Sequence, residues 1–270
     1  MKNRTVLLTG ASEGIGYELA KLFATNGYKL VLVARNHQKL QEVQQELGYL
    51  TDVMIIEKDL SLIDAAQQLY DEIQSSKIQI DVLVNNAGTG LQDHFHHLSA
   101  QEQLRMIQLN ITTLTQLTHL VVQDMLNNSY GRILNIGSIS SFIATPSMAV
   151  YGATKAYVLS FSEALNTELR NKGDYAVTTI CPGPTKTNFA KNGDMRQLGE
   201  LVNLVGVRPE KVAKIAFKSL EKKKTYAIPG KRYGLLLLAA KFIPRRILQF
   251  SIAAITLNNK HEKHSGATFK

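Results

Sequence analysis

Cysteine is nearly absent from this sequence, and so is any spacing typical of a metal site. The one cysteine among the 270 residues, Cys181, excludes an internal disulfide. No set of Cys and His residues has the spacing of a zinc site, so we expect no bound metal. Because chains without disulfides suit a reducing compartment, we expect a cytoplasmic protein.

The sequence also lacks targeting and membrane-spanning patterns. Met1 is followed almost directly by the apolar run "TVLLTG", which leaves no room for a signal peptide or a transit sequence. The apolar stretch near the C-terminus is interrupted by Lys241, Arg245 and Arg246, so it contains no charge-free span of about 20 residues. We therefore expect no transmembrane helix.

Negative charge is scarce in the last quarter of the chain. The whole sequence carries a net charge of +9, but residues 206–270 hold fifteen Lys and Arg against three Asp and Glu, a net +12 that leaves −3 for the rest. A basic segment of this kind indicates either a solvated face or an anionic partner, such as a membrane surface, an acidic carrier protein, a phosphorylated substrate or nucleic acid. We expect no nucleic-acid partner.

Apolar runs alternate with helical patterns along most of the chain, whose composition is 44% hydrophobic and 20% charged. Seven runs are typical of buried strands: "TVLLTG", "KLVLVAR", "DVMIIEKD", "IDVLVNNAG", "GRILNIGS", "YAVTTICPG" and "TYAIPG". Apolar stripes at helical spacing lie between the first runs and end at Gly27 and Gly48. This pattern predicts a single-domain α/β fold, a doubly wound sheet of about seven mainly parallel strands with helices on both faces.

Three later helices have readable start signals. Ser61 with Asp64 is a predicted N-cap, and Ser99 with Glu102 is a predicted capping box. Pro209 is expected in the first turn of another helix, where its missing N–H is not needed.

A glycine-rich loop, "TGASEGIG" at 9–16, stands between the first strand and the first helix. Gly10, Gly14 and Gly16 allow a tight turn in which the N–H groups of the helix N-terminus can face a pyrophosphate. The spacing differs from the G-x-G-x-x-G fingerprint, and a tight turn without a ligand is the alternative. The position within a strand–helix–strand unit favours dinucleotide binding.

The end of the second strand bears on the choice of dinucleotide. Ala34 stands where an NAD site usually offers a carboxylate to the ribose, and Arg35 follows it. An arginine there can pair with a 2′-phosphate, which favours NADP, with NAD the less favoured cofactor. Two considerations oppose this: Glu13 places a negative charge in the glycine loop, and a surface position at a strand end is the alternative for Arg35.

Tyr151 and Lys155 lie four positions apart in "VYGATKAYVLSF", so they share one helical face. A phenol with a pKa of about 10 is a poor base at pH 7, but a nearby ammonium favours its ionised form. Tyr151 can then exchange a proton with an alcohol or an alkoxide. The alternative is a packed tyrosine and a solvated lysine.

Two polar residues support the catalytic interpretation. Ser138 follows the strand run "RILNIG", and the carboxyl ends of parallel strands border the ligand crevice, where its hydroxyl can polarise a carbonyl. Asn110 stands among apolar neighbours in a helical segment. It either satisfies a backbone group or holds a water in a proton path to Lys155.

Taken together, these motifs resemble those of the short-chain dehydrogenase/reductase family. T-G-x-x-x-G-x-G at 9–16, N-N-A-G at 85–88, Asn110, Ser138, the Tyr151/Lys155 pair and "PGPTKT" at 182–187 occur in the family's order. The resemblance covers about residues 4–230 and implies a Rossmann-type fold. It also implies that Tyr151 is the acid/base, that Lys155 lowers its pKa and binds the nicotinamide ribose, that Ser138 orients the substrate and that Asn110 anchors a water relay.

The resemblance further implies a set of residues in contact with the cofactor. Asp59 and the Asn86 region would lie near the adenosine, and the 182–187 segment near the nicotinamide. The expected contacts are Gly10, Ser12, Glu13, Gly14, Ile15, Gly16, Arg35, Asn36, Asp59, Leu60, Asn86, Ala87, Gly88, Tyr151, Lys155, Pro182, Gly183, Thr185 and Thr187.

The function implied is an NADP-dependent oxidoreductase that interconverts a carbonyl and a secondary alcohol. Its substrate is a small molecule, and a lipophilic one is preferred. The alternative is a non-catalytic NADP-binding module with a regulatory or membrane-peripheral role. Members of the family commonly pair through the helices that hold Asn110 and Tyr151, so we expect a homodimer or homotetramer.

Two internal segments have open interpretations. The histidines of "DHFHH" at 93–97 either line the substrate mouth or face solvent, since consecutive side chains seldom converge on one ion. By resemblance, 188–207 is a substrate lid, whose apolar residues form either a cover or core: Phe189, Met195, Leu198, Leu201 and Leu204.

The catalytic domain is expected at 1–230 and an amphipathic extension with a tail at 231–270. In 231–257 apolar residues lie beside Lys and Arg, a composition that suits an interfacial membrane helix. A subunit interface and a flap over the substrate pocket are the alternatives. The last residues, 258–270, are expected to be disordered.

Overall fold

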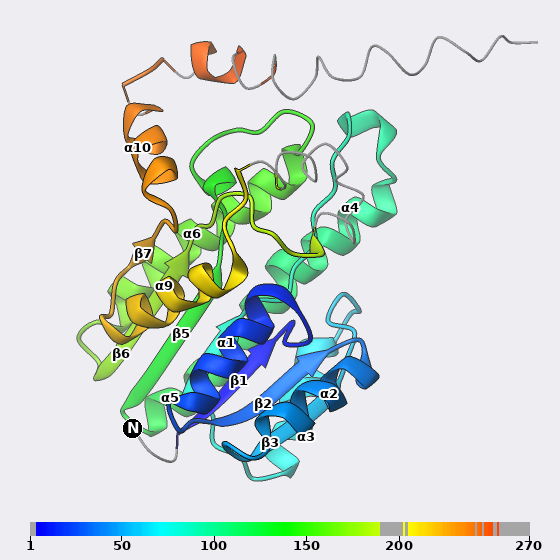
Figure 1. Ribbon diagram of the computed structural model, residues 1–270, viewed down its shortest axis with the longest axis vertical. Helices are drawn as coiled ribbons and strands as arrows, with labels where there is room; N and C mark the ends of the chain where they lie inside the picture. Colours follow the sequence, from blue (N-terminus) through cyan, green and yellow to red (C-terminus); the bar gives the residue numbers. More distant parts are fainter. Residues whose placement is uncertain are drawn as a thin grey trace, which may run out of the picture.

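The computed structural model describes residues 4–189, 202, 205–240, 242–244, 246–250 and 253. A seven-stranded sheet in the order β3-β2-β1-β4-β5-β6-β7 forms its centre, and every neighbouring pair is parallel (Figure 1). The strands are β1 (Thr5–Thr9), β2 (Lys29–Ala34), β3 (Val53–Glu57), β4 (Val82–Asn85), β5 (Tyr130–Ile136), β6 (Asp174–Ile180) and β7 (Tyr226–Ala227). The predicted doubly wound fold and all seven strand runs are confirmed.

Successive strand residues point to opposite faces of the sheet, and here the side chains on both faces are apolar. Helices therefore cover both faces. Val6 and Leu8 belong to one buried cluster, and Leu7 between them belongs to the other. Helices α1 (Gly14–Thr25), α2 (His37–Leu47) and α9 (Pro209–Glu221) supply the first cluster. Helices α3 (Ala65–Ser75), α5 (Leu114–Asn127) and α6 (Ala149–Leu169) supply the second.

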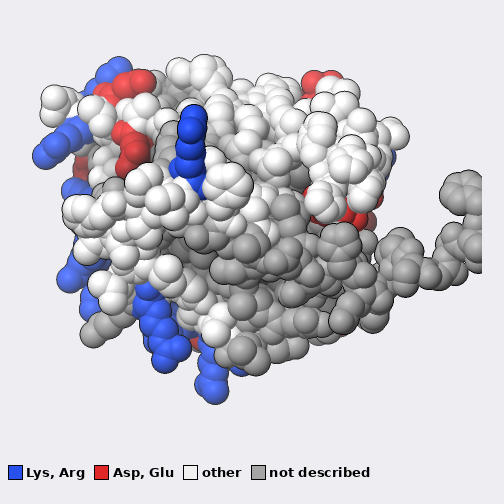
Figure 2. Space-filling view, turned by 90° about the horizontal axis from the view of Figure 1, so that it is seen from above, with Lys and Arg blue, Asp and Glu red and all other residues white. Residues whose placement is uncertain are grey.

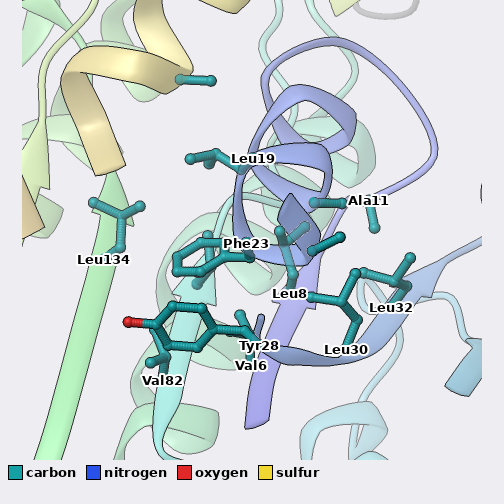
Figure 3. Packing of buried hydrophobic residues seen from close by; sticks show 14 of the residues in the cluster. Val6, Leu8, Ala11, Leu19, Phe23, Tyr28, Leu30, Leu32, Val82 and Leu134 are labelled. Atoms are coloured by element: carbon teal, nitrogen blue, oxygen red, sulfur yellow. The ribbon is translucent and has the colours of Figure 1, made fainter. Parts of the chain in front are cut away.

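Three aromatic side chains fix α1 and α9 against the sheet. The Phe23 ring lies 5.2 Å from the Tyr28 ring and 5.1 Å from the Phe217 ring, both edge to face. Figure 3 shows Phe23 and Tyr28 among the aliphatic side chains of β1 and β2. Edge-to-face pairs add about 0.5–1.5 kcal/mol each to the area they bury.

The sheet order places the carboxyl ends of β1 and β4 next to each other. The chain moves outward from β1 through β2 to β3, then returns to β4 on the other side of β1. At such a reversal the connections leave in opposite directions and a crevice opens. The remaining elements near this edge are η1 (Phe95–His97), α4 (Ala100–Ile107), η2 (Gln108–Thr113) and η3 (Ile139–Ser141).

One of the predicted helix starts is wrong. Helix α3 begins at Ala65, and its cap residue Asp64 has φ 62° and makes no side-chain cap hydrogen bond. Ser61 is instead engaged by Asp59, whose Oδ1 accepts from the Ser61 N–H at 3.0 Å and from its hydroxyl at 2.7 Å. A local Asp side chain competed for the donors that a helix start would have used.

The other two helix starts are found where the sequence placed them. Ser99 caps α4, accepting from the Glu102 N–H at 3.5 Å, and Pro209 occupies the first turn of α9. Within the described residues no helix combines the length and the hydrophobicity needed to cross a bilayer.

The C-terminal extension begins with α10 (Lys231–Ala240), which projects from the body beyond β7 (Figure 1). Its separation from a 1–230 catalytic domain stays a prediction. Four of the five apolar lid residues lie outside the described residues: Met195, Leu198, Leu201 and Leu204. The tail predicted to be disordered, 258–270, also lies outside them.

Candidate active site

Close contacts with the backbone and with Asn86 fix the conformation of the glycine loop. Gly10 has φ 67°, and a Cβ on Gly16 would lie 2.1 Å from the Gly10 carbonyl oxygen. The Asn86 side-chain amide donates to the carbonyls of Thr9 and Gly10, at 3.0 and 2.9 Å. Asn86 therefore shapes the loop, and helix α1 begins at Gly14 with its N–H groups available to an anion.

The N-N-A-G segment is joined to β1 by one threonine. The Thr9 hydroxyl donates to the Val84 carbonyl at 3.2 Å and accepts from the N–H groups of Asn86 and Ala87 at 3.1 and 3.0 Å. The first asparagine, Asn85, is instead buried in the core. Thr9 opens the T-G-x-x-x-G-x-G motif, but its role in joining β1 to the N-N-A-G segment depends on contacts across the fold.

Two basic residues follow β2, Arg35 directly after the strand and Lys39 in the first turn of α2. Arg35 is exposed, and Asn36 caps α2 by accepting from the Lys39 N–H at 2.9 Å. The Lys39 ammonium lies 2.9 Å from Glu13 Oε2, which offsets the negative charge of the glycine loop. The charge that argued against NADP is therefore paired with a lysine one helical turn after Arg35.

Asp59 and Leu60 lie in the connection between β3 and α3. The Asp59 carboxylate is occupied by Ser61, as described above. The Leu60 carbonyl accepts from the Thr113 hydroxyl at 2.8 Å, which links this connection to η2.

Asn110 lies in a π-helical turn, and this deviation aims its side chain inward. Its amide donates to the Thr89 carbonyl at 2.9 Å and to the Thr154 hydroxyl at 3.1 Å, and its oxygen accepts from the Thr89 N–H at 3.0 Å. A Cβ on Gly88 would meet Asn110 Oδ1 at 3.2 Å and Lys155 Nζ at 3.5 Å. Because Gly88 has no side chain, the Asn110 oxygen and the Lys155 ammonium face the same small space beside it. The water relay between Asn110 and Lys155 stays a prediction.

Ser138, Tyr151 and Lys155 meet at the carboxyl end of β5. The Ser138 hydroxyl accepts from the Ser140 N–H at 3.1 Å and lies beside the Tyr151 phenol, whose pKa it lowers as a hydrogen-bonding neighbour. Lys155 Nζ donates to the Ile136 carbonyl at 2.8 Å and lies 5.9 Å from the Tyr151 ring centroid. The Ser141 hydroxyl donates to the Lys155 carbonyl at 2.7 Å, so η3 and α6 are joined directly behind the three side chains.

Burial controls the proton affinities of this pair. Desolvation raises the pKa of Tyr151 to about 12, and the hydrogen bond from Ser138 acts in the opposite direction. Desolvation lowers the pKa of Lys155 to about 8. The expected lowering of the tyrosine pKa by Lys155 is therefore not seen.

The lowered pKa of Lys155 predicts a stability that depends on pH. Below pH 8 both the folded and the unfolded chain hold the proton, so the penalty of burying the ammonium is complete; it is relieved as the pH rises from 8 toward the unfolded value near 10.5. Relative to Lys155→Met, the wild type should gain about 2 kcal/mol of unfolding free energy between pH 7 and 9.5. Urea unfolding of both proteins at the two pH values measures this, and a pH-independent difference would contradict it.

The "PGPTKT" segment closes over the glycine loop. A Cβ on Gly14 would lie 3.0 Å from Thr187 Cγ2, and the Pro182 carbonyl accepts from the Ile139 N–H at 3.0 Å. Thr185 donates to the Gly183 carbonyl at 2.9 Å. The structure therefore gathers the glycine loop, the β5 end and this segment at one edge of the sheet.

An apolar wall lies beside the phenol. The Tyr151 ring is 6.0 Å from the Phe189 ring, and Met106 and Met148 are buried in the same cluster, with Leu91 partly buried against it. Another apolar cavity, of about 630 Å³, lies between the loop after Ser138, the outer side of α6 and the residues Gln249, Phe250 and Ala253. That cavity does not include the catalytic side chains.

The histidine loop has a defined geometry. The rings of His94, His96 and His97 have centroids 4.2–5.7 Å apart, and His97 Nδ1 lies 3.4 Å from Asp93 Oδ1. Among the described residues, no three His, Cys, Asp or Glu side chains are grouped as metal ligands. The Asp93 N–H donates to the Ser147 carbonyl at 3.0 Å, which places the loop near the start of α6.

Fold and site together define a dinucleotide-binding α/β protein with a serine–tyrosine–lysine centre. The family model described as short chain dehydrogenase matches residues 4–198. A probable NADP-dependent dehydrogenase from Haemophilus influenzae is 32% identical over 222 residues, covering 80% of this chain and 86% of that protein. The chain therefore belongs to the short-chain dehydrogenase family, and it is an oxidoreductase with a site for a nicotinamide cofactor.

Solved structures support the same assignment over the whole length. A short-chain dehydrogenase from Sphingobium yanoikuyae in complex with NADPH is 29% identical, with a TM-score of 0.77 and 99% of each chain covered. A bulky-bulky ketone specific alcohol dehydrogenase from Comamonas testosteroni is 28% identical, with a TM-score of 0.74, covering 98% of this chain and 97% of that one.

Proposed function

We propose that this protein is an NADP-dependent oxidoreductase that interconverts a carbonyl and a secondary alcohol. The observation that carries the proposal is the contact between Ser138 and the buried Tyr151 phenol, with Lys155 behind them, at the edge where the glycine loop ends. The relatives named above act with NADP or on ketones by their descriptions, which supports this chemistry.

The protein's part in the reaction is to position an oxygen atom and move a proton. The cofactor supplies or accepts the hydride when bound. In reduction, Ser138 and Tyr151 both hydrogen-bond the carbonyl oxygen, and the phenol donates its proton as that oxygen becomes negative. In oxidation the same two side chains hold the alcohol, and the phenolate removes its proton.

The proton affinity of Tyr151 supports reduction as the favoured direction at neutral pH. A pKa of about 12 keeps the phenol protonated, which is the state an acid requires. Oxidation needs the phenolate, which the positive charge of an oxidised nicotinamide would favour together with Lys155. Reduction should therefore change little between pH 6 and 8, whereas oxidation should rise with pH.

NADP preference is proposed to depend on Arg35 and Lys39 together. Both lie near the end of β2, where the 2′-phosphate of the adenosine would lie, and Lys39 also neutralises Glu13. Arg35→Ala and Lys39→Ala should each raise the Kd for NADPH about tenfold or more, since a charge-assisted hydrogen bond contributes about 1.5–3 kcal/mol. In Arg35→Ala the Kd for NADH should stay nearly constant.

Isothermal titration of both cofactors checks this, with Lys172→Ala as a matched control for the loss of one exposed positive charge. Equal wild-type affinity for NADPH and NADH would refute the NADP preference. If the wild type binds NADPH more tightly than NADH and Lys39→Ala leaves the Kd for NADPH unchanged, only the role of Lys39 is refuted.

A lipophilic carbonyl compound is the proposed substrate class. Phe189, Met106 and Met148 line one side of the tyrosine with apolar atoms, and such a wall favours contact with an apolar group over contact with water. Transfer of deuterium from 4-deuterated NADPH to a panel of bulky, acyl-chain and small polar ketones tests both the activity and the class. Absence of transfer to every ketone would refute the proposed reaction.

A non-catalytic NADP-binding module is the second candidate. The raised pKa of Tyr151 is the observation that favours it. A phenol with so high a pKa is almost never ionised at neutral pH, so it cannot act as a base unless a positive charge nearby lowers that pKa. Cofactor binding with no isotope transfer would support this candidate.

Self-association is proposed through η2, α5 and α6. The outer face of α6 carries small exposed residues, including Ala153 and Ala156, which allow another helix to approach closely. Light scattering after gel filtration should give the mass of a dimer or tetramer.

A further inference from the structure

Large apolar side chains are exposed in unusual density on the C-terminal extension. Seven of the fifteen large hydrophobic residues exposed among the described residues fall within sixteen positions, with exposed fractions of 40–84%. We call them the C-terminal apolar surface: Leu235, Leu236, Leu238, Phe242, Ile243, Ile247 and Phe250. Leaving this many apolar groups in water is unfavourable, so a covering surface is expected.

Helix α10 is fixed to the body on one side only. The Tyr233 hydroxyl donates to the Val205 carbonyl at 3.0 Å, and its ring is packed so closely that a Cβ on Gly183 would lie 2.6 Å away. Leu235, Leu236 and Leu238 are 69%, 66% and 53% exposed, so they point away from this attachment. The helix is thus held in place while its leucines face outward.

The charge around this surface has one sign. Residues 222–261 contain nine Lys and Arg and no Asp or Glu. Arg232 and Arg246 are exposed beside the apolar residues. Figure 2, which looks at the molecule from the end where α10 projects, shows uncharged side chains with Lys and Arg among them and at the margins, together with some Asp and Glu.

We propose that the C-terminal apolar surface docks on an anionic lipid bilayer. Apolar residues entering the headgroup region with cations beside them fit an interfacial segment, because insertion and attraction to anionic lipid add together. A symmetric contact with a second copy would bring two all-positive segments together, which repel each other. The surface is therefore suited to an anionic lipid bilayer, whose interior is apolar and whose headgroups carry negative charge.

Co-sedimentation of the full chain with vesicles tests the proposal. Binding is expected to vesicles of phosphatidylcholine with 30% phosphatidylglycerol, and little to phosphatidylcholine alone. Each Lys or Arg near an anionic surface contributes about fivefold to partitioning, so Arg232→Gln with Arg246→Gln should weaken binding about 25-fold. Raising the salt from 0.1 to 1 M, which shortens the screening length from about 10 to 3 Å, should also release the protein.

The apolar contribution is tested by Leu235→Glu with Leu236→Glu, which should abolish binding to anionic vesicles. Leu62→Glu with Ile63→Glu is the matched control, because these adjacent residues are also exposed, at 55% and 78%, but lie elsewhere. Arg170→Gln with Lys172→Gln is the control for charge. Circular dichroism and the melting temperature confirm that each variant folds.

Three outcomes would overturn the proposal. The first is equal binding to anionic and neutral vesicles, and the second is equal loss in the control pairs. The third is no vesicle binding together with an oligomer that Leu235→Glu with Leu236→Glu converts to monomer, which would make the surface an interface between copies. None of these outcomes bears on hydride transfer, so the proposed function is tested separately.

Discussion

Tyr151→Phe is expected to lower kcat/KM for ketone reduction by about 10²–10⁴-fold while leaving the Kd for NADPH nearly unchanged. The substitution removes one hydroxyl, and with it the proton that the structure places beside Ser138 at this site. General acid catalysis by a positioned side chain contributes rate factors of that size. The ring is kept, so its packing against Phe189 is preserved.

Tyr157→Phe provides the matched control for this prediction. Tyr157 lies on the same helix, and its hydroxyl shares a 2.8 Å hydrogen bond with Thr115 away from the site. It should retain wild-type turnover. If Tyr151→Phe retained turnover as well, proton donation by Tyr151 would be wrong; if both variants lost NADPH binding, the effect would be structural.

Gly16→Ala is expected to raise the Kd for nicotinamide cofactors about 100-fold or more. The added Cβ would lie 2.1 Å from the Gly10 carbonyl oxygen and 2.6 Å from Asn86 Nδ2, so the loop must move. Because Asn86 also holds the Thr9 and Gly10 carbonyls, the movement would spread through the anion-binding turn. Overpacking of this kind should also cost about 1–3 kcal/mol of unfolding free energy.

Gly234→Ala is the control for adding a methyl group at a helical glycine. Nothing lies within 4 Å of the position that a Cβ would take there, so the protein should keep its cofactor affinity and be equally or slightly more stable. Calorimetric titration and urea unfolding of both variants provide the measurement. Wild-type cofactor affinity in Gly16→Ala would show that the loop does not hold the cofactor as proposed.

The pairing of distant polar groups was beyond sequence reasoning. Lys39 and Glu13 are 26 positions apart, and only the packing of α2 beside the glycine loop brings them to 2.9 Å. Asn110 was recognised as a polar residue in an apolar segment, but the π-helical turn that aims it at Thr89 depends on contacts across the fold. Local pattern carries no information on such contacts.

The failed helix start shows the same limit on a smaller scale. Ser61 and Asp64 fit a capping pattern, yet Asp59 holds Ser61 and α3 begins after a residue with φ 62°. The Asp59 side chain accepts from both the N–H and the hydroxyl of Ser61, and a capping pattern in the sequence does not reveal such a bond.

By itself, the sequence determined the number of strands, the two-sided burial of the sheet and the order of the motifs along it, because continuous apolar runs and glycine spacing are local properties. The tertiary structure decided the proton affinities and the partners. Burial of Tyr151 and Lys155 moves both pKa values in directions that an isolated helix would not show, since desolvation depends on everything packed around a group.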